Sequence, residues 1–411
     1  MVMAKIKHRN HINITTFIDG QQINIRNHEG YADVKLAEKL IAGPFGYEWA
    51  APIEKFNPAT WTPEYKAISW NMIMPFYEGY GYVGQMMVWG LKKIGIDISV
   101  FYKPTTDYMK NEIMDVLEKP KRYDCWGIWH HFWQKHGIIP QEKKAMYTMW
   151  ESTQLLPDWA SALNESNLVL VPAQFDIEIF RNAGVKVPIE ILHHGVDQEF
   201  YFYRPKQKRD KFIVGTMGSL VPRKNPELLI KAFEDEFANN NDVQLYLKDS
   251  TEINHLENYI KNNDGRIVYD TRKVSPYELG TLMSEWDIGV FPSRGEGFGL
   301  GGLQSMGVGT TCICTDWSGY KEYLNPEYNY ALKYKMVDIK DFPSNNTHYS
   351  GQWAEADYEH LRQLLRYAYE HRDEVHEKGK KAAQWVKDHW TWQRCAQQLI
   401  DAIDKYEQNK S

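Results

Sequence analysis

Hydrophobic and polar positions along this chain follow two patterns, and the change between them falls near residue 62. In the first part, "INITTFIDGQQINIRN" alternates apolar and polar residues on both sides of Asp19-Gly20, which predicts a β-hairpin. The stretch "ADVKLAEKLIAG" then has helical spacing and ends at Gly43, so it predicts a helix. We therefore expect residues 1–62 to form a small hairpin-helix appendage.

From Lys66 onward, apolar runs of strand length alternate with helical patterns. The first half runs through "KAISWNMIMP", "FYEGYGYVG", "QMMVWGLKKIG" and "IDISVFYK", and the second half repeats this order in "KFIVGTMGSL", "NPELLIKAFEDEF" and "VQLYLKD". Buried strands that alternate with helices predict a parallel sheet covered on both faces. The α/β pattern thus predicts two Rossmann-like doubly wound domains that face a cleft, at residues 63–200 and 212–385, with the charged, Pro205-containing residues 201–211 as a linker.

Length and composition narrow the classes of protein to consider. A chain of 411 residues predicts two or three domains, because a single core seldom grows past about 250 to 300 residues. The formal charge of -6 argues against a surface built wholly for nucleic acid. Four cysteines without a Cys-x-x-Cys pair fit neither a disulfide framework nor a zinc site. With no secretion signal and no apolar stretch near the roughly 18 residues of a membrane span, we expect a cytoplasmic protein.

A glycine-rich segment in the first domain allows two interpretations. Gly79, Gly81 and Gly84 in "GYGYVG" match the dinucleotide fingerprint G-x-G-x-x-G between a strand and a helix. That fingerprint needs an acidic residue about twenty positions later to hold the ribose, whereas the next strand ends in Tyr102 and Lys103. The pattern therefore favours a tight turn at Gly81 that brings backbone near a ligand or the other domain. Glycines that only let the helix pack on the sheet remain the alternative.

The second domain carries a stronger signal for an anion. In "GTMGSLVPRKNPELLIKAF", Gly218 ends a strand, Arg223 and Lys224 follow, and Asn225 is expected to cap a helix that starts at Pro226. Two cations beside a helix start suit a phosphate, although a solvated Arg-Lys pair would look the same.

A second anion cradle is predicted in "RGEGFGLGGLQSMGVGT", residues 294–310. Backbone N–H groups of Gly297 to Leu300 can point at an anion, and a helix starting near Gly302 adds its dipole. Glu296 is the exception, because a carboxylate beside a phosphate is repelled. We expect it to face hydroxyl groups.

These residues resemble a known family. "PSRGEGFGLGGLQSMGVGTTCICTDWSGYKEYL" is similar to the signature of retaining glycosyltransferases of family 4 with the GT-B fold, in which two glutamates are separated by seven residues. "GSLVPRKNPELLIKAF" resembles the phosphate segment of that family, and the resemblance covers residues 66–406. It implies a nucleoside-diphosphate sugar as donor, with UDP or GDP as the nucleotide. It also implies that the amphipathic helix at residues 386–411 crosses back onto the first domain.

The resemblance assigns roles to individual residues. Glu296 matches the glutamate that contacts the transferred sugar, and Arg223 with Lys224 match the segment that neutralises the diphosphate. Two positions depart from the pattern, because the second glutamate is Gln304 and the usual arginine after Gly218 is Ser219. A carboxylate can accept from both ribose hydroxyls, whereas a Gln carbonyl accepts while its NH2 donates, so the hold on the ribose should be weaker or rearranged. Gly297, Phe298, Gly299 and Leu300 match the cradle for the phosphates.

The chemistry predicted from these residues needs neither a metal nor a cofactor. Cleavage of the bond between sugar and phosphate requires stabilisation of the charge on the leaving diphosphate, which the cations and N–H groups can supply. The sequence contains no Asp-x-Asp tripeptide, in agreement with the metal-independent habit of GT-B enzymes. If the enzyme retains configuration, as the resemblance implies, a phosphate oxygen can take the acceptor's proton.

Candidates in the first domain come from family-like positions near the cleft. His130, with His131 beside it in "CWGIWHHFWQKHG", follows a strand-like run where related enzymes place a histidine near the reacting sugar. Glu151 and His194 stand at similar positions, and each could equally link segments of the structure.

Three hypotheses about the acceptor remain open. The first is the hydroxyl of a glycan, a lipid-linked glycan or a small molecule. The second is a hydroxymethylated base in phage DNA, in host cytoplasm, because residues 1–62 loosely resemble modules of phage proteins and basic clusters occur at Lys119, Lys121, Arg122 and at Arg204, Lys206, Lys208, Arg209, Lys211. The third is a non-catalytic sensor of sugar nucleotides, motivated by Gln304 and Ser219.

Overall fold

The computed structural model describes five strands within the first 49 residues and then residues 67–71, 79–101, 110–131, 141–251, 256, 265–341 and 349–409. The chain divides into two compact units, Met1–Tyr65 and Lys66–Ser411.

The first unit is built from short antiparallel strands. Strands β1 (Met3–His8), β4 (Glu29–Asp33) and β5 (Tyr47–Trp49) form a sheet in the order β4-β1-β5. Strands β2 (Ile14–Ile18) and β3 (Gln21–Ile25) pair antiparallel, which confirms the predicted hairpin, whose turn at 19–20 lies outside the described residues. Ala32 and Asp33, expected to begin a helix, belong to β4, where they pair with β1. The rest of that predicted helix lies outside the described residues.

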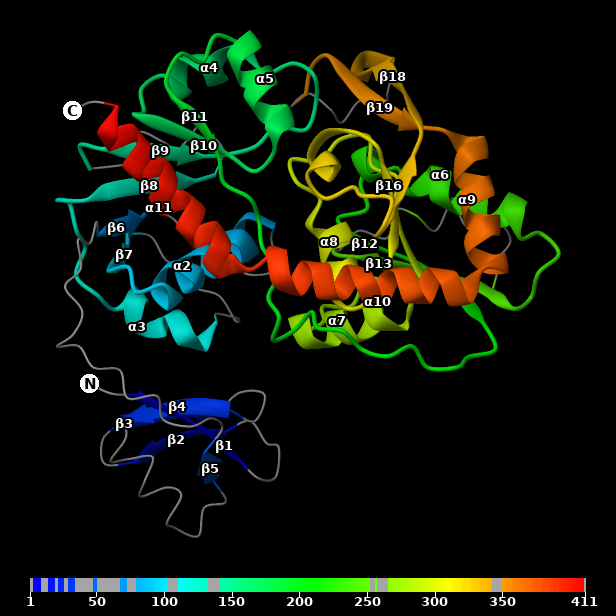
Figure 1. Cartoon of the computed structure of the whole chain (residues 1–411), viewed down its shortest axis with the longest axis horizontal. Helices are drawn as coiled ribbons and strands as arrows, with labels where there is room; N and C mark the ends of the chain where they lie inside the picture. Colours follow the sequence, from blue (N-terminus) through cyan, green and yellow to red (C-terminus); the bar gives the residue numbers. More distant parts are fainter. Residues whose placement is uncertain are drawn as a thin grey trace. The chain divides into compact units, whose positions relative to one another are not determined.

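The second unit contains two six-stranded parallel sheets, which lie side by side in Figure 1. The first sheet has the order β11-β10-β9-β8-β6-β7. Its strands are almost wholly buried, which explains their continuous apolar sequences. They are β6 (Ile68–Trp70), β7 (Ile98–Val100), β8 (Trp126–His130), β9 (Lys144–Tyr147), β10 (Leu168–Val171) and β11 (Ile189–Ile191), and the helices between them include α2 (Gly79–Lys93), α3 (Met114–Leu117), α4 (Pro157–Leu163) and α5 (Gln174–Asn182).

The second sheet has the order β14-β13-β12-β15-β16-β17, in which the direction of strand addition reverses between β12 and β15. Its strands are β12 (Phe212–Gly218), β13 (Val243–Asp249), β14 (Ile267–Asp270), β15 (Ile288–Phe291), β16 (Cys312–Thr315) and β17 (Tyr330–Leu332). The helices are α6 (Pro226–Glu236), α7 (Pro276–Glu285), α8 (Leu300–Gly307), α9 (Tyr358–Glu370) and α10 (Arg372–His389). The two sheets confirm the predicted pair of Rossmann-like domains.

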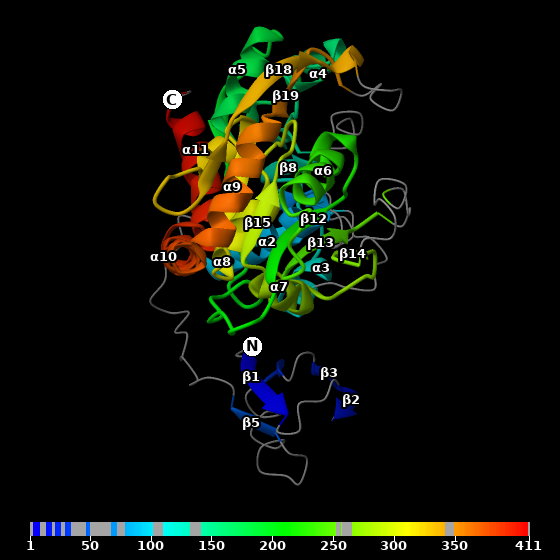
Figure 2. The ribbon, with the colours of Figure 1, turned by 90° about the vertical axis from the view of Figure 1, so that its right-hand side faces the viewer.

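Two further elements connect the domains. An antiparallel hairpin of β18 (Tyr334–Asp338) and β19 (Gln352–Ala356) belongs to the second domain by sequence, and Figure 2 shows it near α4 and α5 of the first. Helix α11 (Trp392–Gln408) lies on the first domain in Figure 1, where the backbone of Trp392 touches Gly90 of α2. The indole N–H of Trp126 in β8 also donates to the Glu407 carboxylate at 2.8 Å.

Three helices of the second unit start at side-chain caps, whereas the cap predicted for α6 is absent. Ser275 and Glu278 form a reciprocal capping box at α7, and Asp357 and Thr391 cap α9 and α11. Asn225 precedes Pro226 as predicted, but its side chain does not cap α6. The Asn225 amide donates instead to the Glu355 carboxylate at 3.1 Å, and its backbone adopts a left-handed conformation with φ of 57°.

Candidate functional site

The predicted anion-binding residues follow the two strands where the order of the second sheet reverses. Gly218 ends β12, and Arg223 and Lys224 lie in the 3-10 helix Pro222–Lys224 that follows. Phe291 ends β15, and the glycine-rich loop follows it. In open parallel sheets, ligands bind in the crevice beyond the carboxyl ends of the strands at this reversal.

Ion pairs bring these two loops together. The Lys224 ammonium lies 2.6 Å from Oε1 of Glu296, and the Arg223 guanidinium lies 3.2 Å from the same oxygen. Arg223 also donates to the carbonyl of Gly295. Burial favours the neutral form of Glu296, but the charges of Lys224 and Arg223 outweigh it and lower the pKa of Glu296. Glu296 is therefore an ionised, 4% exposed carboxylate.

The backbone around Glu296 is fixed from the neighbouring segment. Its N–H donates to Oγ of Ser318 at 3.0 Å, and its carbonyl accepts from the N–H of Gly319 at 2.9 Å. Ser318 has a positive φ of 54°, a conformation that Ser seldom adopts. These bonds hold the carboxylate in place before any ligand binds.

The glycine-rich loop leads directly into α8. Gly299 is the residue before the helix and has φ of 85°, and a Cβ atom there would lie 2.3 Å from the ring of Tyr320. Gly297 packs against Met149, and Phe298 is buried with its ring 4.7 Å from that of His194. The helix begins at Leu300, two residues earlier than expected, so the N–H groups of its first turn open towards this loop.

The first domain contributes Glu151, which follows β9. Its Oε1 lies 3.0 Å from the Arg223 guanidinium, so Arg223 bridges two carboxylates from different domains. Burial opposes the charge on Arg223, but Glu151 and Glu296 outweigh it and raise its pKa further above the ordinary value. The predicted residues Arg223, Lys224, Glu296 and Glu151 therefore form one cluster.

The two predicted histidines, His130 and His194, are buried, and three of their four ring nitrogens have no hydrogen-bond partner. His130 is 1% exposed and stacks on Tyr147 at 4.6 Å, and its Nε2 has no partner. Both ring nitrogens of His194 lack hydrogen-bond partners. Burial, and after it the charge of His193, lowers the pKa of His194 to about 3. Burial, with the nearby His194 and His131, also lowers the pKa of His130. Neutral rings with unused nitrogens can accept hydrogen bonds from hydroxyl groups.

Two other predicted residues lie differently from expectation. Gly81 is inside α2, which begins at Gly79, so no tight turn occurs at Gly81. Its neighbour Tyr82 accepts a hydrogen bond from the N–H of Asp197 at 3.3 Å. Gln304 is buried in α8 beside Tyr82, which places the ribose position of the resemblance next to the first domain. A neutral amide is accommodated there more easily than a glutamate, which would bury a charge.

Three residues at the site were missed by the sequence reasoning. Tyr349 donates its hydroxyl to Oε2 of Glu151, and the indole N–H of Trp353 donates to the Glu151 carbonyl at 2.9 Å. Asp176 in α5 accepts from the Trp150 N–H at 2.9 Å, has one oxygen without a partner, and has a pKa raised by burial. Of these three residues, only Asp176 could have been found from the sequence, as an acidic residue in the first turn of a helix. Tyr349 and Trp353 belong to no recognisable motif.

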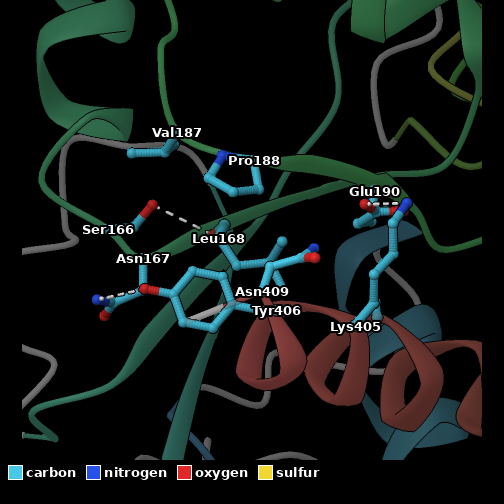
Figure 3. Close-up of a pocket in the computed structure, with 10 residues that line it drawn as sticks. Ser166, Asn167, Leu168, Val187, Pro188, Glu190, Lys405, Tyr406 and Asn409 are labelled. Carbon is cyan, nitrogen blue, oxygen red and sulfur yellow. Dashed lines mark hydrogen bonds and ion pairs between the residues drawn. The ribbon is translucent and has the colours of Figure 1, made fainter. Parts of the chain in front are cut away.

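The cavity in Figure 3 lies at another edge of the first domain. It has a volume of about 390 Å³ and is lined where β10 and β11 begin, opposite the strand ends that carry the site. The Glu190 and Lys405 side chains pair across it at 2.6 Å.

Within the described part of the chain, no helix is long and apolar enough to span a membrane. The same residues contain no cluster of three His, Cys, Asp or Glu side chains able to hold a metal ion.

Comparisons with known proteins agree with this geometry. Residues 197–342, which carry Arg223 and Glu296, match the family described as "Glycosyl transferases group 1". This segment is therefore similar to the group 1 glycosyltransferases. An uncharacterized glycosyltransferase of Methanocaldococcus jannaschii is 30% identical to the chain over 157 residues, which cover 37% of this chain and 41% of the relative. The chain thus matches about two fifths of the length of this relative.

Solved structures extend the similarity beyond the group 1 segment. HepE of Anabaena, solved in complex with UDP and glucose, has a TM-score of 0.60 at 13% identity, covering 83% of this chain and 100% of HepE. Sucrose-phosphate synthase from Thermosynechococcus elongatus has a TM-score of 0.61 at 14% identity, covering 83% of this chain and 98% of the synthase. At these low identities the likeness establishes only the fold. That fold is GT-B, and it extends beyond residues 197–342.

Proposed function

We propose that this protein is a glycosyltransferase that moves a sugar from a nucleoside-diphosphate sugar to an acceptor hydroxyl. The observation that carries the proposal is the meeting of Arg223 and Lys224 with Glu296 and the glycine-rich loop where the sheet order reverses. Cations and helix N–H groups suit a diphosphate, and a fixed carboxylate suits sugar hydroxyls. The group 1 match adds support, and the UDP in the HepE structure makes UDP the first nucleotide to test.

The proposed reaction proceeds with retention and without a metal. Arg223, Lys224 and the N–H groups at the start of α8 would stabilise the charge that develops on the departing diphosphate. Glu296 would hold hydroxyls of the transferred sugar, and His130 and His194 would accept from sugar or acceptor hydroxyls. A diphosphate oxygen would take the proton of the attacking hydroxyl, so the family 4 type of mechanism needs no protein nucleophile.

A glycan or small-molecule acceptor is favoured over DNA. At least four of the eight cations in the basic clusters that suggested DNA have local partners. Lys119 and Arg122 both bind Asp97, at 2.8 and 2.7 Å. Lys206 donates to the carbonyl of Ser284 at 3.1 Å, and Arg209 pairs with Glu285 at 3.3 Å. Cations engaged in this way offer little attraction to a phosphate backbone. The linker at residues 201–211 is thus tied to the second domain.

Thermal unfolding with UDP, GDP, ADP, their sugar conjugates and NAD tests the proposal. We expect one nucleoside diphosphate to raise the unfolding temperature, since a ligand at a hundred times its dissociation constant adds about 2.7 kcal/mol. The rise should vanish in Arg223→Ala and persist in Lys231→Ala, a control change at an exposed lysine on α6 that contacts Asp235 and Tyr358. A rise with NAD alone would contradict the proposal. Slow hydrolysis of a sugar donor, lost in Glu296→Ala, would exclude the non-catalytic sensor.

A further inference from the structure

The hairpin of β18 and β19, with residues 349–351, fastens the second domain to the loop that carries Glu151. We call residues 334–341 and 349–356 the strap. Gln154 and Ser350 form a β-bridge, and Thr153 donates its N–H to the carbonyl of Gln352 at 3.1 Å. The N–H of Gln352 returns a bond to Oγ1 of Thr153 at 2.8 Å. The strap therefore continues as paired backbone across the boundary between the domains.

The strap and its surroundings fix every polar oxygen of Glu151. Oε2 accepts from the Tyr349 hydroxyl, and the carbonyl accepts from the Trp353 indole. Burial and the charge of Glu151 raise the pKa of Tyr349, so its hydroxyl stays protonated and donates. The Glu151 carbonyl also packs against Gly295 so closely that a Cβ atom there would lie 2.1 Å away. The remaining oxygen, Oε1, points at Arg223.

The charges in this cluster balance without a ligand. Arg223 and Lys224 supply two positive charges, while Glu151 and Glu296 supply two negative charges. Glu296 comes from the same domain as the cations and is held by Ser318 and Gly319, so it stays beside them. Glu151 comes from the opposite domain. It occupies a position on Arg223 that a diphosphate oxygen would also take.

We propose that the strap uses Tyr349 and Trp353 to position Glu151 as a stand-in anion on Arg223, which the diphosphate of the donor must displace. This inference rests on the proposed function of the same site. Glu151 then sets the affinity for the diphosphate, and Tyr349 and Trp353 are positioning residues that act through it.

The exchange has a clear electrostatic basis. A diphosphate that enters beside an ionised Glu151 meets a like charge, and that repulsion is large in a partly buried site. Release of Glu151 from Arg223 removes the repulsion but breaks the pair held by the strap. Arg223 is the shared partner, so gain of the diphosphate and loss of Glu151 are coupled.

Calorimetric titration of the full chain with UDP, inorganic pyrophosphate and uridine tests this inference. Glu151→Gln keeps the shape of the side chain and removes its charge, and we expect it to tighten binding of UDP and pyrophosphate by about tenfold. Tyr349→Phe should tighten both by about threefold, because Glu151 loses one donor. Uridine carries no phosphate, so its affinity should not change. Asp338→Asn is the matched control, since Asp338 lies on β18 and pairs with Gln352 and Lys340.

The outcomes separate this inference from the proposed function. If wild type binds UDP and Glu151→Gln binds it equally or more weakly, the stand-in role is wrong while the donor site stands. If neither form binds UDP or any other nucleoside diphosphate, the proposed function fails and the inference falls with it. A strap with a merely structural role would lower the unfolding temperature of Tyr349→Phe and leave its affinity for pyrophosphate unchanged.

Discussion

At the scale of single residues, the site depends on side chains whose chemistry the sequence announces and on others that it hides. Glu296, Arg223 and Lys224 stand in a recognisable pattern, and the structure brings both cations within 2.6 to 3.2 Å of the Glu296 carboxylate. The pairing of Glu296 with both cations was not expected, because the sequence argument placed this carboxylate against hydroxyls alone. Tyr349 could not be found in this way, since its role comes from a contact with a residue 198 positions away.

Gly299 gives a prediction at this scale. Its φ of 85° suits glycine, and a Cβ atom would also lie 2.3 Å from the Tyr320 ring. We expect Gly299→Ala to lower the free energy of unfolding by about 2 kcal/mol or more, from the left-handed backbone and the overlap together. Urea unfolding measures the change. Gly265→Ala, where nothing lies within 4 Å of the added atom, should stay within about 0.5 kcal/mol of wild type.

At the scale of elements, buried strands were easy to locate and glycine-rich segments were not. The apolar runs "LVLV" and "IGVF" became β10 and β15, because only a strand covered on both faces tolerates such sequences. "GYGYVG" looked like a turn, yet Gly79 begins α2 and Gly81 lies within it. Tertiary packing favours the helix here, because Tyr82 and Met86 lie one helical turn apart in α2 and are both buried in the core.

Packing of α11 on α2 can be tested with two glycines of the same helix. A Cβ atom on Gly90 would lie 2.5 Å from the carbonyl oxygen of Trp392, whereas one on Gly79 would meet nothing within 4 Å. Gly90→Ala should therefore destabilise the protein by about 1 to 2 kcal/mol, the overlap exceeding the gain in helix propensity. Gly79→Ala should be neutral or stabilise by up to about 1 kcal/mol. Equal unfolding temperatures for the two variants would show that α11 does not press on Gly90.

At the scale of the whole molecule, the sequence predicted two domains and the resemblance implied a C-terminal helix that returns to the first, but neither predicted the side-chain contacts that join the domains. Repeated patterns of strands and helices are local and carry over directly into two sheets. The strap and the ion pair between Glu151 and Arg223 join residues far apart in the chain, so no spacing rule predicts them. The surroundings of His194 likewise come from both domains, because its ring lies 4.7 Å from that of Phe298 in the second domain.

The burial of His194 predicts how stability depends on pH. Its folded pKa of about 3 lies below the unfolded value of about 6.5, so the unfolded chain binds the extra proton between these values and stability falls as pH drops below 6.5. His194 alone should cost about 2 kcal/mol between pH 7 and pH 5. His130, whose pKa is also lowered, adds to this loss of stability, and Asp176, whose pKa is raised, opposes it. Both residues are still present when His194 alone is replaced.

The measurement is the free energy of unfolding in urea at pH 7 and pH 5 for wild type and His194→Gln. The difference between the two pH values should be about 2 kcal/mol smaller in the variant. An unchanged difference would mean that His194 takes up its proton without unfolding.

The polypeptide passes between the two GT-B domains twice, at adjacent points. Val196, on the outward passage, forms a parallel bridge with Thr391 on the return, and its N–H donates to the Trp390 carbonyl at 2.8 Å. The second domain therefore begins and ends at one place and consists of a single uninterrupted stretch of chain. We expect that such a stretch can be replaced as one block by the equivalent stretch of a relative, with the two points of connection to the first domain left unaltered.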